Sequence, residues 1–180
     1  MNKQIDISNV ILHTERLTLR PWSLSDLNDF YEYASVDGVG QMAGWLPHKN
    51  IEESLSILQM FINERKTFAI EFEGKVIGSL GIEHYHEEEL PEFSDKQGRE
   101  IGYVLSKDYW GRGLMPEAVA EVIKYLFDVV HLDFIVCGHF VDNFQSMRVQ
   151  EKCGFKHYKL VKYATRYGEV KDCWLSIIER

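Results

Sequence analysis

The chain has 180 residues, of which 45% are hydrophobic and 13% aromatic, and its formal net charge at pH 7 is −8. This length and composition fit a single domain over residues 1–180. No apolar run is long enough for a membrane span, no secretory signal is visible, and no dense basic run offsets the acidic charge. We therefore expect a cytoplasmic protein that binds neither nucleic acid nor membranes. The three cysteines are widely spaced and odd in number, which indicates neither a disulfide framework nor a metal site.

In the first half of the chain, apolar residues recur in some stretches at the spacing of a strand and in others at the spacing of a helix. Alternating apolar residues predict a strand near the start, and two amphipathic stretches predict two helices after it. A glycine-rich loop that contains Trp45 separates the helices, and a strand–turn–strand pattern with its turn at Glu73-Gly74 predicts a hairpin. In chain order, these elements occupy residues 16–22 (strand), 23–35 and 50–66 (helices) and 67–85 (hairpin).

The second half begins with an acidic segment, residues 86–99, which we expect to be an exposed loop. The patterns then predict a strand over 100–106, helices over 114–127 and 143–153 with a strand over 132–140 between them, and a closing hairpin about Tyr167-Gly168-Glu169. The first of these helices connects two strands that can run parallel, whereas the hairpins need antiparallel pairs. The expected fold class is α+β, with a mixed, mostly antiparallel twisted sheet and helices packed on it.

Two glycines, Gly111 and Gly113, stand where a predicted strand turns into a helix. Free backbone N–H groups at such a junction can converge on a pyrophosphate, with the helix dipole behind them. The P-loop and the dinucleotide fingerprint are both excluded, because Leu114-Met115 and Pro116 stand where those motifs need other residues. A plain tight turn remains the alternative. The candidate phosphate-binding groups are the N–H groups of Gly111, Gly113, Leu114 and Met115, with the Arg112 side chain.

Five segments together resemble the GNAT superfamily of acyl-CoA-dependent N-acyltransferases, and more closely its Rim-type branch, the ribosomal-protein N-terminal acetyltransferases. They are HTERLTLRPWSLSD, VIGSLGI, EIGYVLS, YWGRGLMPEAV and NFQSMRVQEKCGF. The resemblance covers nearly the whole chain, and it rests on the order and spacing of motifs that are individually loose. One departure is Asp108, which stands where the family often has Gln or Arg before the glycine turn.

The resemblance implies a three-layer α/β/α sandwich and an N-acetyltransferase that uses acetyl-CoA as co-substrate and no metal. The acetyl group would pass by direct attack, in a ternary complex, to a primary amine of a protein N-terminus or of a small molecule. A non-catalytic acyl-CoA-binding module of the same fold is the alternative. The protein would be a monomer or a homodimer, and its loops 36–50 and 86–98 would shape the acceptor site, with Trp45 as a wall.

The resemblance also assigns roles to particular residues. Backbone groups of Tyr103, Val104 and Leu105 would pair with the pantetheine arm of CoA. Asn143 would hydrogen-bond that arm or a water, and Ser146 would donate a hydrogen bond to the leaving sulfur. From the residues alone, Asn143 is equally a helix N-cap and Ser146 an ordinary serine of the first turn.

Two carboxylates at strand ends are candidates for the general base. Glu100 and Glu83 can each accept the proton of the amine through a water if burial raises the pKa of the carboxyl group. A carboxylate at a strand end is also common in a structural salt bridge. Glu100 is slightly preferred, because Rim-type relatives often carry a glutamate at this place.

Overall fold

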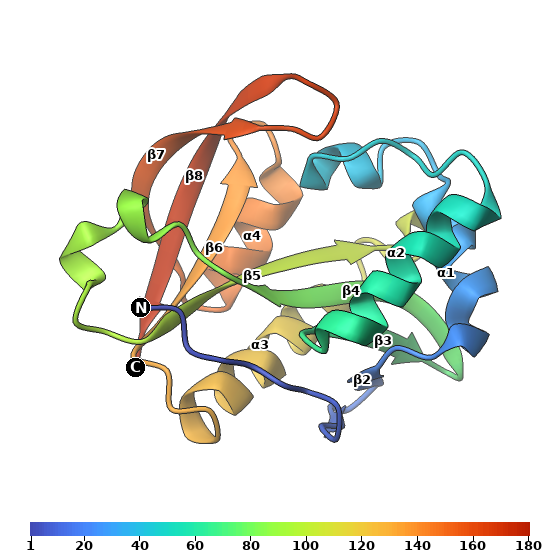
Figure 1. The fold of residues 1–180 in the computed structure, drawn as a ribbon, viewed down its shortest axis with the longest axis horizontal. Coiled ribbons are helices and arrows are strands. Elements are labelled where there is room, and N and C mark those ends of the chain that lie inside the picture. Colours follow the sequence, from blue (N-terminus) through green and yellow to red (C-terminus); the bar gives the residue numbers. More distant parts are fainter.

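The computed structural model describes residues 1–180 and consists of one eight-stranded sheet with four α-helices packed on it (Figure 1). The strand order is β1-β2-β3-β4-β5-β6-β8-β7, and every neighbouring pair is antiparallel except β5 and β6. No helix is both long and apolar enough to cross a membrane. The strands are β1 Leu12–His13, β2 Leu17–Pro21, β3 Thr67–Phe72, β4 Lys75–Glu83, β5 Gly98–Leu105, β6 Phe134–Phe140, β7 Lys156–Ala164 and β8 Val170–Glu179; the helices are α1 Leu27–Ala34, α2 Ile51–Glu64, α3 Leu114–Asp128 and α4 Phe144–Lys152.

The expected α+β class and the mixed, mostly antiparallel sheet are confirmed, including the parallel pair joined by α3. The sheet differs from the prediction by one additional strand and by several strand ends. The sequence does not predict β1, because a strand of two residues is too short to show a period. Strand β5 begins at Gly98 rather than at Glu100, since Gly98 and Arg99 already pair with β6.

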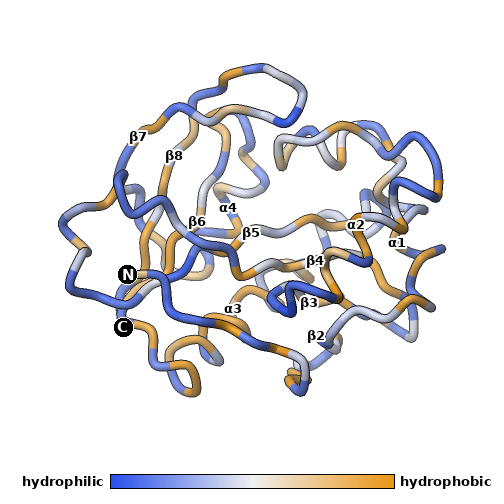
Figure 2. The backbone as a smooth tube through the Cα atoms, in the orientation of Figure 1, coloured by the Kyte–Doolittle hydropathy of each residue, from blue (hydrophilic) through white to orange (hydrophobic).

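Helices cover both faces of the sheet, because successive residues of a strand point to opposite sides. Ile70 of β3 belongs to the core cluster that includes α3, whereas its neighbour Ala69 belongs to the cluster formed with α1 and α2. Figure 2 shows the hydrophobic stretches gathered in the central strands and in the helices against them. The side chains that α3 buries are Leu114, Met115, Ala118, Val119, Val122 and Leu126.

The acidic segment between β4 and β5 is not the exposed loop that its composition predicts. Leu90 and Phe93 are buried, and the Phe93 ring lies 4.5 Å from the ring of Phe134 on β6. These two apolar side chains cover one face of β6 and β8, while Glu87 and Glu88 remain exposed. Apolar burial therefore anchors an otherwise polar segment beside the sheet.

Strands β5 and β6 pair over only part of their length. Gly98–Ile101 pairs with Phe134–Cys137, and beyond Ile101 the two strands separate (Figure 1). From there β5 stays beside β4, and β6 stays beside β8. One edge of β5, residues 102–105, is therefore left without a strand partner.

Candidate active site

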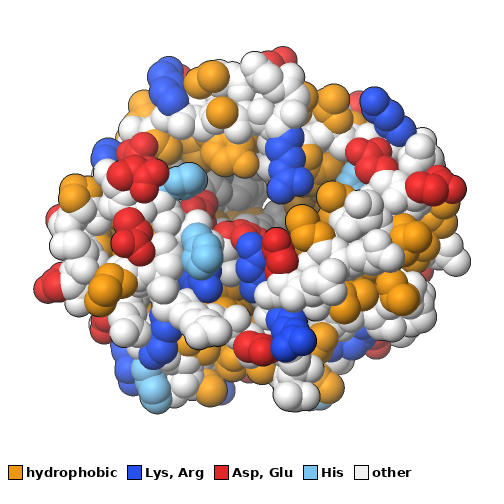
Figure 3. Space-filling view, in the orientation of Figure 1, with side chains coloured by type: hydrophobic (Ala, Val, Ile, Leu, Met, Phe, Trp, Pro, Cys, Tyr) orange, Lys and Arg blue, Asp and Glu red, His pale blue; other side chains and the backbone are white.

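A cleft of about 1260 Å³ is lined by β4, β5, β6, α4, the segment between α1 and α2, and the β7–β8 hairpin. It includes the place where β5 and β6 separate, and Figure 3 shows a hollow in the middle of this face of the molecule. The structure brings nearly all of the predicted site residues together here. Those that line the cleft are Glu83, Glu100, Tyr103, Val104, Leu105, Gly111, Gly113, Leu114, Met115, Asn143 and Ser146.

The glycine turn presents unused donors at the N-terminus of α3. Gly111 and Gly113 have φ angles of 76° and 73°, in the left-handed region that favours glycine. The N–H groups from Gly111 to Met115 donate no hydrogen bond to another backbone group, and a Cβ built on Gly111 would meet no atom within 4 Å. Free donors at a helix N-terminus attract anions. This open turn therefore fits the pyrophosphate of a CoA molecule, and the unpartnered edge of β5 fits its amide-bearing arm.

Arg112 is the one predicted phosphate-binding residue that lies outside the lining of the cleft. Its side chain does not line the cleft, and its guanidinium lies 5.0 Å from the centre of the Tyr109 ring and donates to the carbonyl of Asp108 at 3.0 Å. The carbonyl of Arg112 accepts a hydrogen bond from Arg16 at 3.0 Å, and Arg16 forms an ion pair with Glu117 of α3. Arg112 and Arg16 thus hold the turn from outside.

Asn143 and Ser146 lie at the start of α4. The Asn143 side chain caps the helix by accepting from the Ser146 N–H at 3.1 Å, and its amide nitrogen donates to the carbonyl of Met42 at 3.3 Å. Asn143 therefore is the N-cap that the residue pattern allowed, and it also ties α4 to the segment between α1 and α2.

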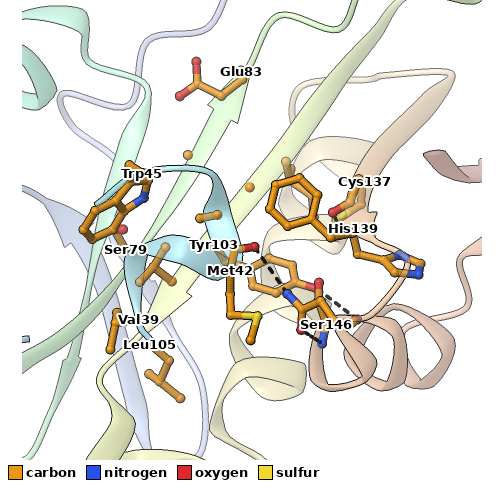
Figure 4. Close-up of a pocket in the computed structure, with 18 of the residues that line it drawn as sticks. Val39, Met42, Trp45, Ser79, Glu83, Tyr103, Leu105, Cys137, His139 and Ser146 are labelled. Carbon is orange, nitrogen blue, oxygen red and sulfur yellow. Dashed lines mark hydrogen bonds between the residues drawn. The ribbon is translucent and has the colours of Figure 1, made fainter. Parts of the chain in front are cut away.

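The Ser146 hydroxyl has a partner that the sequence does not indicate. Its Oγ lies 2.9 Å from the hydroxyl of Tyr103, and Figure 4 shows these two side chains side by side in the cleft. Burial raises the pKa of Tyr103 well above its ordinary value, so the phenol keeps its proton. Only the packing of β5 against α4 brings these residues together, so no local sequence signal identifies them as partners.

The two candidate bases have different surroundings. Glu83 and Glu100 are directly opposite each other on β4 and β5, and Glu83 forms an ion pair with Lys66. Burial raises the pKa of Glu100 to about 7, while His86 acts to lower it and the charge of Glu83 adds to the rise. The Glu100 carboxyl group can therefore accept a proton near neutral pH.

The cleft has open space over Gly102 of β5. Gly81 and Gly102 are opposite each other on β4 and β5, and a Cβ built on Gly102 would meet no atom within 4 Å, whereas one built on Gly81 would lie 2.8 Å from Glu83 Oε1. Trp45 lines the cleft, and its ring occupies the space that a side chain at position 40 would need, since a Cβ built on Gly40 would lie 2.2 Å from it. Gly102, two residues from Glu100 on the same strand, therefore leaves room for a reacting group.

Residues 16–156 match the family described as the acetyltransferase (GNAT) domain. The chain is 31% identical over 170 residues to the N-acetyltransferase YoaA of Bacillus subtilis (strain 168), a match that covers 90% of this chain and 92% of that one. It is 28% identical over 180 residues to the N-acetyltransferase p20 of Bacillus licheniformis, with 94% and 96% covered.

Solved structures share the fold. An acetyltransferase of the GNAT family from Bacillus anthracis matches with a TM-score of 0.82 at 24% identity, covering 94% of this chain and 98% of that one. The ribosomal-protein alanine acetyltransferase of Vibrio fischeri matches with a TM-score of 0.72 at 21% identity, covering 95% and 97%. A microcin self-immunity acetyltransferase in complex with acetyl-CoA and AMP matches with a TM-score of 0.75 at 20% identity, covering 92% and 93%.

The sequence matches and the geometry of the cleft lead to the same conclusion. The expected superfamily, its three-layer fold and its co-substrate are confirmed, and catalysis rather than simple acyl-CoA binding is the activity shared by the named relatives. This chain belongs to the GNAT family and is an N-acetyltransferase that uses acetyl-CoA.

Proposed function

We propose that the enzyme acetylates a primary amine by direct attack within a ternary complex, with Glu100 as the general base. An amine is a nucleophile only after it loses its ammonium proton, and a base acts best when its pKa lies near the working pH. The observation that carries the proposal is the Glu100 carboxyl group, whose pKa burial raises to about 7 and which lines the cleft near the end of the pairing between β5 and β6.

Bound acetyl-CoA supplies the thioester, and this chain holds it. The proposed contacts are the free edge of β5 at Tyr103, Val104 and Leu105 for the pantetheine arm, and the N–H groups from Gly111 to Met115 for the pyrophosphate. Residues 102–105 have no strand partner toward β6, and the N–H groups from Gly111 to Met115 donate to no backbone group; the Leu105 carbonyl accepts from the Trp110 indole at 2.9 Å, which leaves its N–H group for the proposed contact. Asn143 caps α4 and thereby places Ser146, and its remaining hydrogen-bonding capacity is assigned to the pantetheine arm or a water.

The proton and bond changes balance without a further reactant. The ammonium proton passes to Glu100, directly or through a water, and the neutral amine nitrogen then bonds to the acetyl carbon as the carbon–sulfur bond breaks. The nitrogen loses its second proton to the leaving sulfur through solvent, so the products are the amide, CoA and protonated Glu100. The leaving thiolate accepts a hydrogen bond from the Ser146 hydroxyl. Hydrogen bonding suffices for this role, because a serine hydroxyl is too weak an acid to be expected to give up its proton.

The cysteines of the cleft support direct attack over an acyl-enzyme. Cys137 and Cys173 both line the cleft, and burial raises the pKa of Cys173 to about 12 and that of Cys137 well above its ordinary value. The nucleophilic form of cysteine is the thiolate, which these surroundings disfavour. Glu83, in turn, is engaged with Lys66, so we assign it the role of setting the pKa of Glu100.

The proposed acceptor is a protein N-terminus or a small amine. One kinetic experiment identifies the acceptor class and distinguishes direct attack in a ternary complex from an acyl-enzyme. Purified enzyme and acetyl-CoA are mixed with short peptides that have free N-termini, with polyamines and with amino sugars, and thiol release is measured. We expect release with one of these classes and intersecting double-reciprocal lines. Parallel lines together with an acetylated enzyme in the mass spectrum would overturn direct attack. Absence of thiol release with every class would count against a primary amine as the acceptor.

A further inference from the structure

Two buried polar side chains without a role in the proposed acetyl transfer are linked to Ser146 by hydrogen bonds. Gln150 lies one turn further along α4, and His139 lies on β6; they are 1% and 4% exposed. The Gln150 Nε2 atom lies 3.4 Å from Ser146 Oγ and 3.1 Å from the carbonyl oxygen of Gly138. The Gln150 Oε1 atom lies 2.9 Å from His139 Nδ1. A continuous row of hydrogen bonds therefore runs from β6 to the Ser146 hydroxyl.

The carbonyl of Gly138 determines the direction of every bond in this row. A carbonyl oxygen can only accept, so the Gln150 atom that faces it must be the NH₂ group. The other amide atom is then the oxygen, which requires His139 to carry its proton on Nδ1. Because the NH₂ group has two hydrogens, its second one is available to Ser146 Oγ. Gln150 is thus a donor to Ser146.

This direction affects where the hydroxyl hydrogen of Ser146 can point. A serine oxygen accepts two hydrogen bonds and donates one. Gln150 supplies one of the accepted bonds. The Tyr103 hydroxyl has one hydrogen and lies 2.9 Å from Ser146 Oγ and 3.3 Å from the Ser146 carbonyl oxygen, so it supplies the second accepted bond when its hydrogen points along the shorter contact. In that arrangement the hydrogen of Ser146 has no partner in the protein. A reversed Gln150 amide would instead place an acceptor next to Ser146 and attract that hydrogen away from the cleft.

We propose that Gln150 and His139 are positioning residues that keep the Ser146 hydroxyl free to donate to the leaving sulfur. His139 holds the amide of Gln150 in one orientation, and Gln150 in turn orients Ser146. The inference rests on the proposed role of Ser146 in acetyl transfer. Its competitor is a purely structural role, since buried polar side chains normally find hydrogen-bond partners for stability alone.

A double-mutant cycle separates the two roles. Gln150→Leu, His139→Leu and Ser146→Ala are made singly, and the two leucine variants are also made in the Ser146→Ala background. We expect each leucine variant to lower kcat by about tenfold with less than about a twofold change in KM for acetyl-CoA, as for an interaction made mainly in the transition state. In the Ser146→Ala background, neither leucine substitution should lower kcat further, because residues that act through one group are not additive.

Conservative replacement gives a second, independent readout. In His139→Asn, an amide nitrogen stands near the place of Nδ1 and can still donate to Gln150, so kcat should return to within about threefold of wild type. Glu151→Gln changes an exposed neighbour on α4 and should leave kcat unchanged. If Gln150→Leu fails to fold, the His139→Leu and His139→Asn pair still tests the proposal, with thermal melting of each variant as the check on folding.

The outcomes are distinguishable. If Ser146→Ala keeps full turnover, the proposed role of Ser146 is wrong and the inference fails with it. If Ser146→Ala is slow, but the leucine variants lower kcat by the same factor in both backgrounds, acetyl transfer stands as proposed and the positioning role is overturned. Equal losses in His139→Asn and His139→Leu would also overturn it.

Discussion

Glu83 of β4 and Glu100 of β5 are direct cross-strand neighbours, yet Glu83 has an ion-pair partner, Lys66, and Glu100 has none. Burial raises the pKa of Glu100 to about 7, and the nearby charge of Glu83 adds to the rise. The strand pairing therefore contributes to the strength of the base that lines the cleft.

Replacing Glu100 with Gln should remove the acidic limb of the pH–rate profile. In the wild-type enzyme, kcat/KM should fall as the pH drops below about 7, because Glu100 becomes protonated. The variant should lose about 100-fold in kcat/KM at pH 8 and show no such limb, since general-base catalysis contributes about 10²–10⁴-fold. Glu52→Gln, an exposed change on α2, is the control. A Glu100→Gln enzyme that keeps its acidic limb would exclude Glu100 as the base.

Replacing Glu83 with Gln should move the same limb to lower pH. The substitution removes the negative charge that helps to raise the pKa of Glu100, while an amide keeps much of the shape of the side chain. We expect a shift of about half a unit to one unit, the size of a single charge interaction at this range in a partly solvated cleft. The measurement is the midpoint of the acidic limb. A midpoint that stays in place or rises would show that Glu83 does not set the pKa of Glu100.

The raised pKa of Glu100 also predicts how stability depends on pH. The folded state holds this proton up to a pH of about 7, whereas the unfolded chain releases it near 4.5. Between those values the folded state binds more protons, so this group makes the free energy of unfolding fall as the pH rises. Glu100→Gln should lack this decrease and should melt about 2–4 °C above wild type at pH 8. A difference in melting temperature between Glu100→Gln and wild type that is the same at pH 4 and at pH 8 would contradict the prediction.

Replacing Gly111 with Asp should weaken acetyl-CoA binding at least about tenfold, because it places a carboxylate among the free N–H groups that would bind the pyrophosphate. The substitution also puts a side chain at a residue in the left-handed conformation, which disfavours side chains. The matched control is Gly74→Asp in the β3–β4 turn, where φ is 81° and a Cβ would also meet no atom within 4 Å. Both variants should lose about 1–2 kcal/mol of stability through the same backbone strain. Isothermal titration with acetyl-CoA should distinguish them, and equal affinity in the two variants would refute the pyrophosphate assignment.

The sequence alone predicts the structural features that depend on residues close together in the chain. The glycine turn at Gly111-Gly113, the helix that follows it and the Asn143 cap are each formed within a few residues, so spacing and residue type predict them. The order of strands and helices follows in the same way from hydrophobic periods. The strand-to-helix turn, and with it the expected anion site, therefore follows from residue types and their spacing.

Only the tertiary structure decides which side chains meet. Tyr103 and Ser146 are joined across the gap between β5 and α4, and no pattern within either segment indicates this pair. The same holds for the ion pair of Glu83 with Lys66 and for the burial of Leu90 and Phe93 in a polar segment. A pKa and a hydrogen-bond direction depend on distances between atoms that are remote in sequence. The chain thus encodes its elements locally, while packing of the sheet and helices sets the chemistry of the cleft.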